Sequence, residues 1–241
     1  MKERILVALD VETREQALRL ADGLRGSVGG FKIGSRLFTA EGPSMVRTLT
    51  ERGDRVFLDL KFHDIPNTVA TAVEAATQLG VWMVNVHASG GTAMMRAARA
   101  AAHETAAKHN IQPPLVIAVT VLTSMSQAAL LETGIPIDLM DQVLRLAELT
   151  RDAGLDGVVA SPRETSAIRS RCGAAFAIVT PGIRGGALRQ GSGQAAFKDD
   201  QERTMSPADA VAAGASYLVV GRPIIAAPDP KAAARSIVES L

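Results

Sequence analysis

The chain has 241 residues, 47% of them hydrophobic, which is enough to bury a core of its own. Its 26 Lys and Arg side chains nearly balance 25 acidic ones, and it has only six Phe, one Trp and one Tyr, so neither charge nor aromatic surface favours a nucleic-acid or membrane partner. No apolar run reaches about 18 residues, the length that a membrane-spanning helix needs. A single cysteine excludes an internal disulfide, and the N-terminus leads straight into a short apolar run. We therefore expect a cytoplasmic protein.

Short apolar runs alternate with longer stretches of helical period along the chain, which is the pattern of repeated strand and helix units. The predicted strands are residues 4–9, 30–33, 55–60, 82–86, 115–121, 157–160, 176–179 and 217–220. The predicted helices are residues 13–24, a stretch after Pro43 through Arg52, 68–79, about 93–108, 137–153, a stretch from about 162, and 231 to the C-terminus.

Eight such units of about 30 residues each predict an α/β protein, a single (β/α)8 TIM barrel over residues 1–241. A doubly wound open sheet is the alternative, but Asp-Val-Glu-Thr stands at residues 10–13, where that fold has a glycine fingerprint. Residues 185–204 are rich in Gly, Ser, Gln and Ala and are predicted to form a mobile lid.

In a barrel the functional side chains lie at the C-terminal ends of the strands. The third strand ends in Asp59 and Lys61, which strand alternation places on one face, and Asp64 follows in the loop. The second strand ends with Lys32, so two ammonium and two carboxylate groups can converge. Such an array is suited to a developing carbanion, although a solvated charged loop is the alternative for this segment.

The turns after the seventh and eighth strands combine glycine with arginine, where barrels often bind phosphate. Arg184 follows the seventh strand, and Gly221 and Arg222 follow the eighth. Glycine lets backbone N–H groups approach an anion, and arginine binds phosphate with two parallel hydrogen bonds. We therefore predict a phosphate site there, with two unrelated turns as the alternative.

His63 and His87 fall near strand ends, where histidines hold a divalent metal in some barrels. The ammonium of Lys61, between Asp59 and Asp64, would occupy the place of such a cation, and no further ligand pair appears at the strand ends. We therefore predict no metal site and interpret His87 as a hydrogen-bonding residue.

Residues 59–68, Asp-Leu-Lys-Phe-His-Asp-Ile-Pro-Asn-Thr, closely resemble the signature of the orotidine 5'-phosphate decarboxylase family. Blocks similar to the family follow its order over essentially the whole chain, at residues 6–10, 31–34, 86–91, 121–124, 180–184 and 220–223. The resemblance implies cofactor-independent decarboxylation of orotidine 5'-phosphate to UMP and CO2 in pyrimidine biosynthesis. It also implies a homodimer with shared active sites.

The resemblance further implies a role for each matching residue. Lys61 would stabilise the C6 carbanion and then protonate it, and Asp59 would lie where the substrate carboxylate is crowded. Lys32 would complete the array and contact the ribose together with Asp10. Asp64 and Thr68 would reach across the dimer into the partner's site.

The resemblance assigns the rest of the substrate to other residues. Thr123 or its neighbour Ser124 would meet the pyrimidine. The 5'-phosphate would be held by Arg184, Gly221, Arg222 and a lid glutamine, for which Gln201 matches the family's pattern better than Gln190 and Gln194.

Two other functions compete with this interpretation. A sugar-phosphate lyase or decarboxylase of the same barrel superfamily would use Mg²⁺, but residues 65–68 and Arg222 favour the nucleotide enzyme. A catalytically silent nucleotide-binding barrel would not need Lys32, Asp59, Lys61 and Asp64 together.

Overall fold

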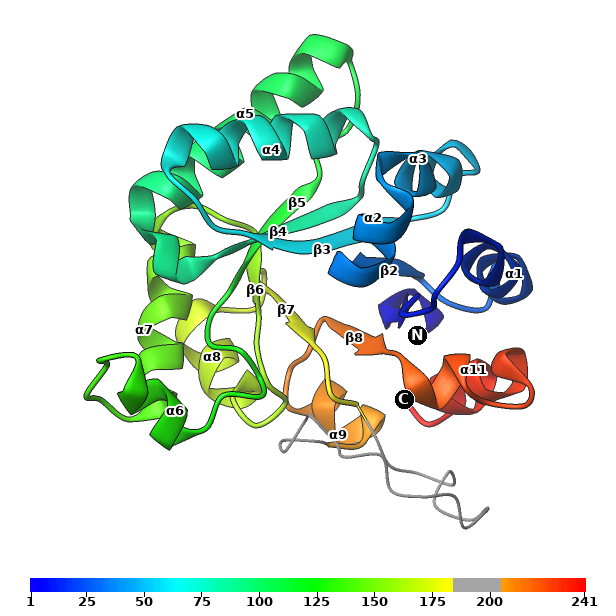
Figure 1. Cartoon of the computed structure of the whole chain (residues 1–241). Helices are drawn as coiled ribbons and strands as arrows, with labels where there is room; N and C mark the ends of the chain where they lie inside the picture. Colours follow the sequence, from blue (N-terminus) through cyan, green and yellow to red (C-terminus); the bar gives the residue numbers. More distant parts are fainter. Residues whose placement is uncertain (184–204) are drawn as a thin grey trace.

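Eight parallel strands close into a barrel in which each strand pairs with the next and the last pairs with the first (Figure 1). The computed structural model describes residues 1–183 and 205–241, and every statement on the fold refers to them. The strands are β1 (Ile5–Ala8), β2 (Gly30–Gly34), β3 (Val56–Phe62), β4 (Met83–His87), β5 (Leu115–Val119), β6 (Gly157–Val159), β7 (Ala177–Thr180) and β8 (Tyr217–Val220). The predicted (β/α)8 barrel is therefore confirmed, and the open doubly wound sheet is excluded.

Helices follow the strands and surround the barrel (Figure 1). They are α1 (Arg14–Leu24), α2 (Ser35–Glu41), α3 (Pro43–Glu51), α4 (Pro66–Gln78), α5 (Gly91–His109), α6 (Gln127–Glu132), α7 (Leu139–Asp152), α8 (Thr165–Cys172), α9 (Pro207–Ala212), α10 (Arg222–Ile225) and α11 (Pro230–Glu239), with 3-10 turns at Lys2–Arg4 and Ala88–Gly90. Local chemistry fixes the helix starts: the side chain of Thr13 accepts from Gln16 N–H, and Asp138 accepts from Met140 N–H.

The predicted boundaries differ from the structure in a few places. The pattern does not predict α2, α6, α9 and α10, because helices of four to seven residues complete too few turns to show a helical period. Strand β5 ends at Val119 rather than residue 121, and β3 continues past residue 60 to Phe62.

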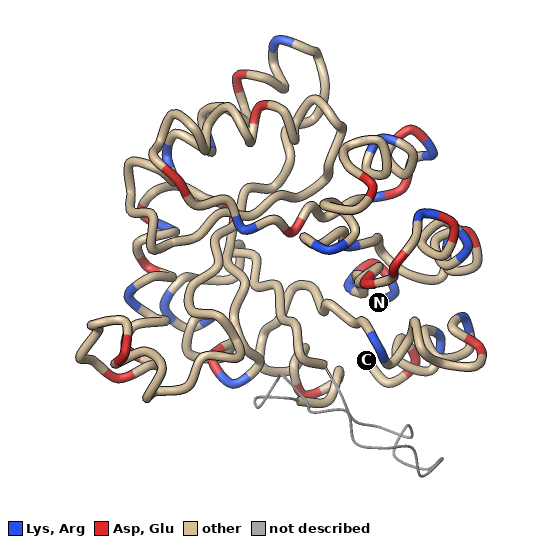
Figure 2. Tube along the Cα trace, viewed as in Figure 1, with Lys and Arg blue, Asp and Glu red and all other residues tan. Residues whose placement is uncertain are grey.

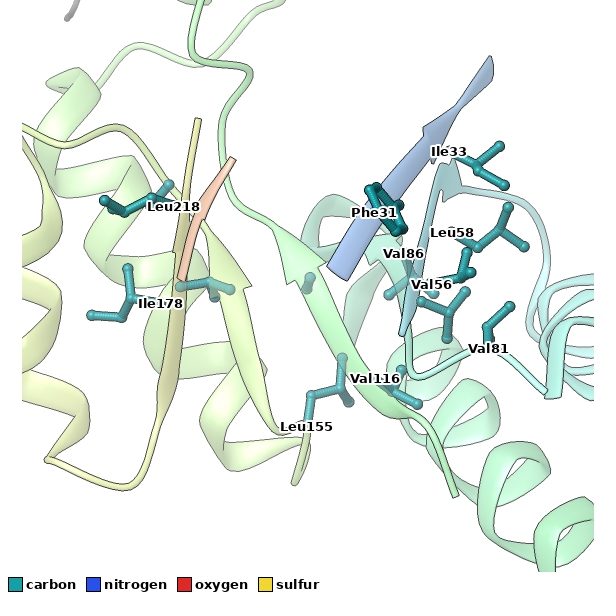
Figure 3. Packing of buried hydrophobic residues seen from close by; sticks show 14 of the residues in the cluster. Phe31, Ile33, Val56, Leu58, Val81, Val86, Val116, Leu155, Ile178 and Leu218 are labelled. Carbon is teal, nitrogen blue, oxygen red and sulfur yellow. The ribbon is translucent and has the colours of Figure 1, made fainter. Parts of the chain in front are cut away.

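Alternate residues of the strands pack on opposite sides of the barrel wall. The interior holds a small apolar cluster that includes Leu6, Phe57 and Ile117. A larger cluster fills the space between strands and helices, and Figure 3 shows part of it, with Leu58 and Ile178 among the labelled residues. Two apolar layers therefore fix the strands from both sides.

The end of the barrel where the strands begin is closed by aromatic side chains. The rings of Trp82 and Tyr217 meet edge to face with centroids 5.1 Å apart, and the guanidinium of Arg55 lies 5.3 Å from the Trp82 ring centroid.

Charged residues lie mainly on the surrounding helices (Figure 2). Of the helices described, none has the length and apolar character needed to cross a bilayer.

Candidate active site

A cavity of about 460 Å³ opens at the C-terminal ends of the strands, within the size range of small-molecule sites. Its floor is apolar and comes from inward-facing strand residues, namely Ala8, Phe57, Val119, Val159 and Val219. Charged side chains project above this floor, namely Asp10, Lys32, Asp59, Lys61 and Arg222. The cavity therefore combines an apolar bed for a flat ring with a dense set of charges.

Four of these charged groups form a continuous array across three strands. The Lys32 ammonium lies 3.2 Å from Asp10 Oδ1 and 3.5 Å from Asp59 Oδ2. The Lys61 ammonium donates to Asp59 Oδ1 at 2.7 Å. Asp59 thus stands between two lysines, as predicted, but the second carboxylate of the array is Asp10 and not Asp64, which lies outside the cavity lining.

The side chains of Lys32 and Asp59 are nearly buried, at 10% and 13% exposure, whereas Lys61 is 35% exposed. Burial by itself would raise the pKa of Asp59, but the charges of Lys32 and Lys61 and hydrogen bonds from Lys61 and Asn85 outweigh it and lower the pKa. The carboxylate of Asp59 is therefore ionised at neutral pH.

Asp59 and Lys61 project into the same cavity, as predicted, but regular strand alternation is not the reason. The pairing of β3 with β4 is irregular: Leu58 pairs with Val84, but the next pair is Phe62 with Val86. Within this bulge Lys61 has a left-handed backbone, with φ at 54°. The bulge, rather than a regular pleat, directs the ammonium toward Asp59.

Sequence reasoning missed Asn85, which holds this bulge. Its side chain is fully buried on β4, donates to Asp59 Oδ1 at 2.7 Å and accepts from the backbone N–H of Lys61 at 2.8 Å. The signal was present, because a polar residue in the apolar run at residues 82–86 needs partners inside the protein.

Gly34, at the end of β2, leaves room for the Lys32 ammonium. A Cβ at this position would lie 2.8 Å from Lys32 Nζ, closer than ordinary contact allows. The backbone φ of Gly34 is −97°, which any residue can adopt. The glycine is therefore needed for space and not for its conformational freedom.

His63 and His87 form a pair at the rim, with ring centroids 5.4 Å apart. Burial, and then the nearby charges of His63 and Lys61, lower the pKa of His87. Within residues 1–183 and 205–241, no group of three or more His, Cys, Asp or Glu side chains has the arrangement of a metal site.

The remaining predicted residues divide into three groups. Thr123 and Gly221 line the cavity together with Arg222, whereas Ser124 is exposed and is not among the described lining residues. Asp64 and Thr68 are exposed and also lie outside the lining; Asp64 Oδ1 accepts from Ile65 N–H. Arg184, the lid at 185–204 and its candidates Gln190, Gln194 and Gln201 lie outside the described residues.

A closed (β/α)8 barrel with an array of two lysines around the carboxylate of Asp59 at its strand ends defines a barrel enzyme for a small, charged substrate. The chain belongs to the orotidine 5'-phosphate decarboxylase / HUMPS family, whose model matches residues 3–237.

Relatives and solved structures agree with this membership. The chain is 55% identical over 241 residues to the orotidine 5'-phosphate decarboxylase of Moorella thermoacetica, covering 100% of this chain and 92% of the relative. It is 51% identical to that of Syntrophotalea carbinolica, covering 100% and 95%. The crystal structure of orotidine 5'-phosphate decarboxylase from Lactobacillus acidophilus matches with a TM-score of 0.84 and 35% identity, over 98% of this chain and 97% of that one.

Proposed function

We propose that the chain decarboxylates orotidine 5'-phosphate to UMP and CO2 in pyrimidine biosynthesis, without a cofactor, and that the array around Asp59 carries the reaction. Family membership over residues 3–237 supports the activity. The observation that carries the assignment of the site is the Lys61 ammonium, 2.7 Å from an ionised carboxylate at the mouth of a cavity with an apolar floor.

The reaction needs a cation close to C6 of the pyrimidine. The bond between C6 and the carboxylate breaks, CO2 leaves, and the electron pair remains on C6, where the ring delocalises it poorly. The fixed ammonium of Lys61 stabilises this charge and then transfers a proton to C6, which gives UMP. The neutral amine of Lys61 then regains its proton from solvent. Because the ammonium stabilises the charge on C6, the cycle needs no electron-sink cofactor.

The neighbours of Lys61 hold its side chain in place. Asp59 stays ionised between two ammonium groups and lies where the substrate carboxylate is crowded. Lys32, bound to both Asp59 and Asp10, completes the array, and with Asp10 it contacts the ribose. A preformed array of this kind stabilises a developing charge without reorganising during the reaction.

The 5'-phosphate binds at the turn after β8, away from C6 of the pyrimidine, where the reaction takes place. Gly221 and Arg222 line the cavity there, and Thr123 also lines it, where it would contact the pyrimidine. Arg184 and Gln201 remain predicted phosphate contacts. Binding energy from a remote phosphate can position the reacting ring, which lowers the barrier at C6.

We also propose a homodimer in which Asp64 and Thr68 complete the partner's site. Both are exposed, and Ile65 between them is 66% exposed, a large apolar side chain that a second copy would cover. Mixing Asp64→Ala and Lys61→Ala chains tests this arrangement. Random exchange should restore about a quarter of wild-type activity, because half the dimers are mixed and each has one intact site. A mixture that exchanges subunits but stays inactive would exclude shared sites.

The activity itself is tested by following the loss of orotidylate absorbance. Wild-type chain should turn over fully in EDTA, whereas an EDTA-sensitive activity would indicate the Mg²⁺-dependent alternative. Lys61→Ala should lose at least about 10³-fold in kcat while still binding UMP, because it removes the principal charge at C6. No turnover by the wild type, with UMP still bound, would indicate a silent nucleotide-binding barrel.

The cytoplasm is the proposed location. The one cysteine, Cys172, is a free thiol that is only partly exposed at the end of α8. A protein without disulfides suits a reducing compartment.

A further inference from the structure

We propose that Asn85 is a positioning residue that holds Lys61 and Asp59 in their reactive arrangement. The inference rests on the proposed function of the array. It starts from the register of β3 and β4: between the pairs Leu58 with Val84 and Phe62 with Val86, β4 contributes only Asn85. Residues 59–61 of β3 therefore face one residue of β4.

The two hydrogen bonds of Asn85 bridge both ends of this bulge. Its carbonyl oxygen accepts the N–H of Lys61 at 2.8 Å, and its amide nitrogen donates to Asp59 Oδ1 at 2.7 Å. The orientation of the amide follows from the partners, because an N–H can only donate and an ionised carboxylate can only accept. A hydroxyl at this position is shorter, and an apolar group makes neither bond.

These bonds have different consequences for the site. The bond to Lys61 N–H replaces a ladder hydrogen bond that the bulge removes, and it fixes a backbone with φ at 54°, which a lysine rarely adopts. The bond to Asp59 fixes the carboxylate oxygen that also accepts from the Lys61 ammonium. One buried amide thus fixes the backbone of Lys61 directly and its ammonium through Asp59.

The burial of Asn85 makes this function specific. The side chain is 0% exposed and is not part of the cavity lining described, so it acts through Asp59 and Lys61 rather than on the substrate. On its other side Asn85 pairs with Ile117 of β5, which is apolar. The charged or titratable groups near it are Asp59 and Lys61 on β3, Lys32 beyond Asp59, and His87 two residues along β4.

Two substitutions separate positioning from simple structural support. Asn85→Leu keeps the number and branching of the side-chain heavy atoms but removes both bonds, and a misplacement of Lys61 by about 1 Å should lower kcat about 100-fold. The affinity for UMP should change less than about threefold, since the contacts with phosphate and ribose lie elsewhere. Thr77→Val is the matched control: it removes a buried hydrogen bond to Val73 O in α4, far from the cavity, and should leave kcat and KM unchanged.

Asn85→Asp gives a pH profile that a structural role would not produce. The new carboxylate can still accept from Lys61 N–H, but it must share a proton with Asp59 to form the second bond. The ratio of variant to wild-type kcat/KM should therefore rise as the pH falls, by about tenfold per pH unit above the pKa of the shared proton. Asn85→Leu should show no such rise.

The outcomes distinguish this proposal from the function on which it rests. An inactive wild type overturns the function. An active wild type with Asn85→Leu within twofold of its kcat, or with equal losses of kcat and UMP affinity, overturns the positioning role. If circular dichroism shows that Asn85→Leu does not fold, Asn85→Asp decides between the outcomes. A ratio of variant to wild-type kcat/KM that stays flat from pH 8 to pH 5.5 overturns the proposal, and a ratio that rises as the pH falls supports it.

Discussion

The substitution Gly34→Ala tests whether the position of the Lys32 ammonium matters for catalysis. The added Cβ would lie 2.8 Å from Lys32 Nζ, and ordinary contact begins at 3.4 Å, so the ammonium must move by about 0.6 Å. The next nearest atom, Asp10 Oδ1 at 3.5 Å, already lies at contact distance, so the flexible lysine end is what yields. The shift changes a salt bridge of 3.2 Å to Asp10 and one of 3.5 Å to Asp59.

A displacement of this size should lower kcat/KM about tenfold, which is about 1.4 kcal/mol of transition-state stabilisation. Stability should change by less than about 1 kcal/mol, because the backbone φ of Gly34 suits alanine. Steady-state decarboxylation gives kcat/KM, and thermal unfolding gives the stability. Gly23→Ala in α1 is the matched control, since its Cβ would meet nothing within 4 Å, and it should retain full activity. If Gly34→Ala stays within twofold of the wild type, the ammonium's position is not limiting.

Two further predictions concern stability. The pKa of His87 is lowered chiefly by burial. Below about pH 6.5 the unfolded chain therefore binds more protons than the folded chain, and the unfolding free energy decreases as the pH is lowered. Denaturant unfolding at pH 7 and pH 5.5 should show a smaller acid loss in His87→Gln; an equal loss contradicts the burial effect. Leu218→Ala removes a fully buried side chain between β8 and the helices. In guanidinium unfolding it should lower the unfolding free energy by about 2–5 kcal/mol. A change below about 1 kcal/mol would mean that this layer repacks.

The fold could be predicted because its strands carry a strong local signal. Each apolar run is short and bounded by turn residues or by a helical stretch. Eight such runs, separated by segments long enough for a crossover connection, leave few alternatives to a barrel. The missed helices are short, and tertiary context decides whether such segments are helical. The helix α10, for example, has four residues and starts directly after Gly221 at the end of β8.

The candidate site was predictable to the extent that covalent spacing and strand ends determine it. Lys32, Asp59 and Lys61 share one cavity because the C-terminal ends of parallel neighbours meet at the same edge of the barrel. The geometry of Lys61 was not predictable, because a bulge depends on the register with a strand more than 20 residues away.

The sequence indicates that Asn85 has buried partners, and the register of β3 and β4 identifies them. In the sequence it is only a polar residue within an apolar strand, which indicates a buried group with partners but does not name them. Once β4 lies beside β3, one side chain faces residues 59–61 and can satisfy both an amide N–H and a carboxylate. Asn85 accepts from the N–H of Lys61, whose backbone is left-handed, so on the proposed mechanism the array would depend on a residue outside the family-like segment at 59–68.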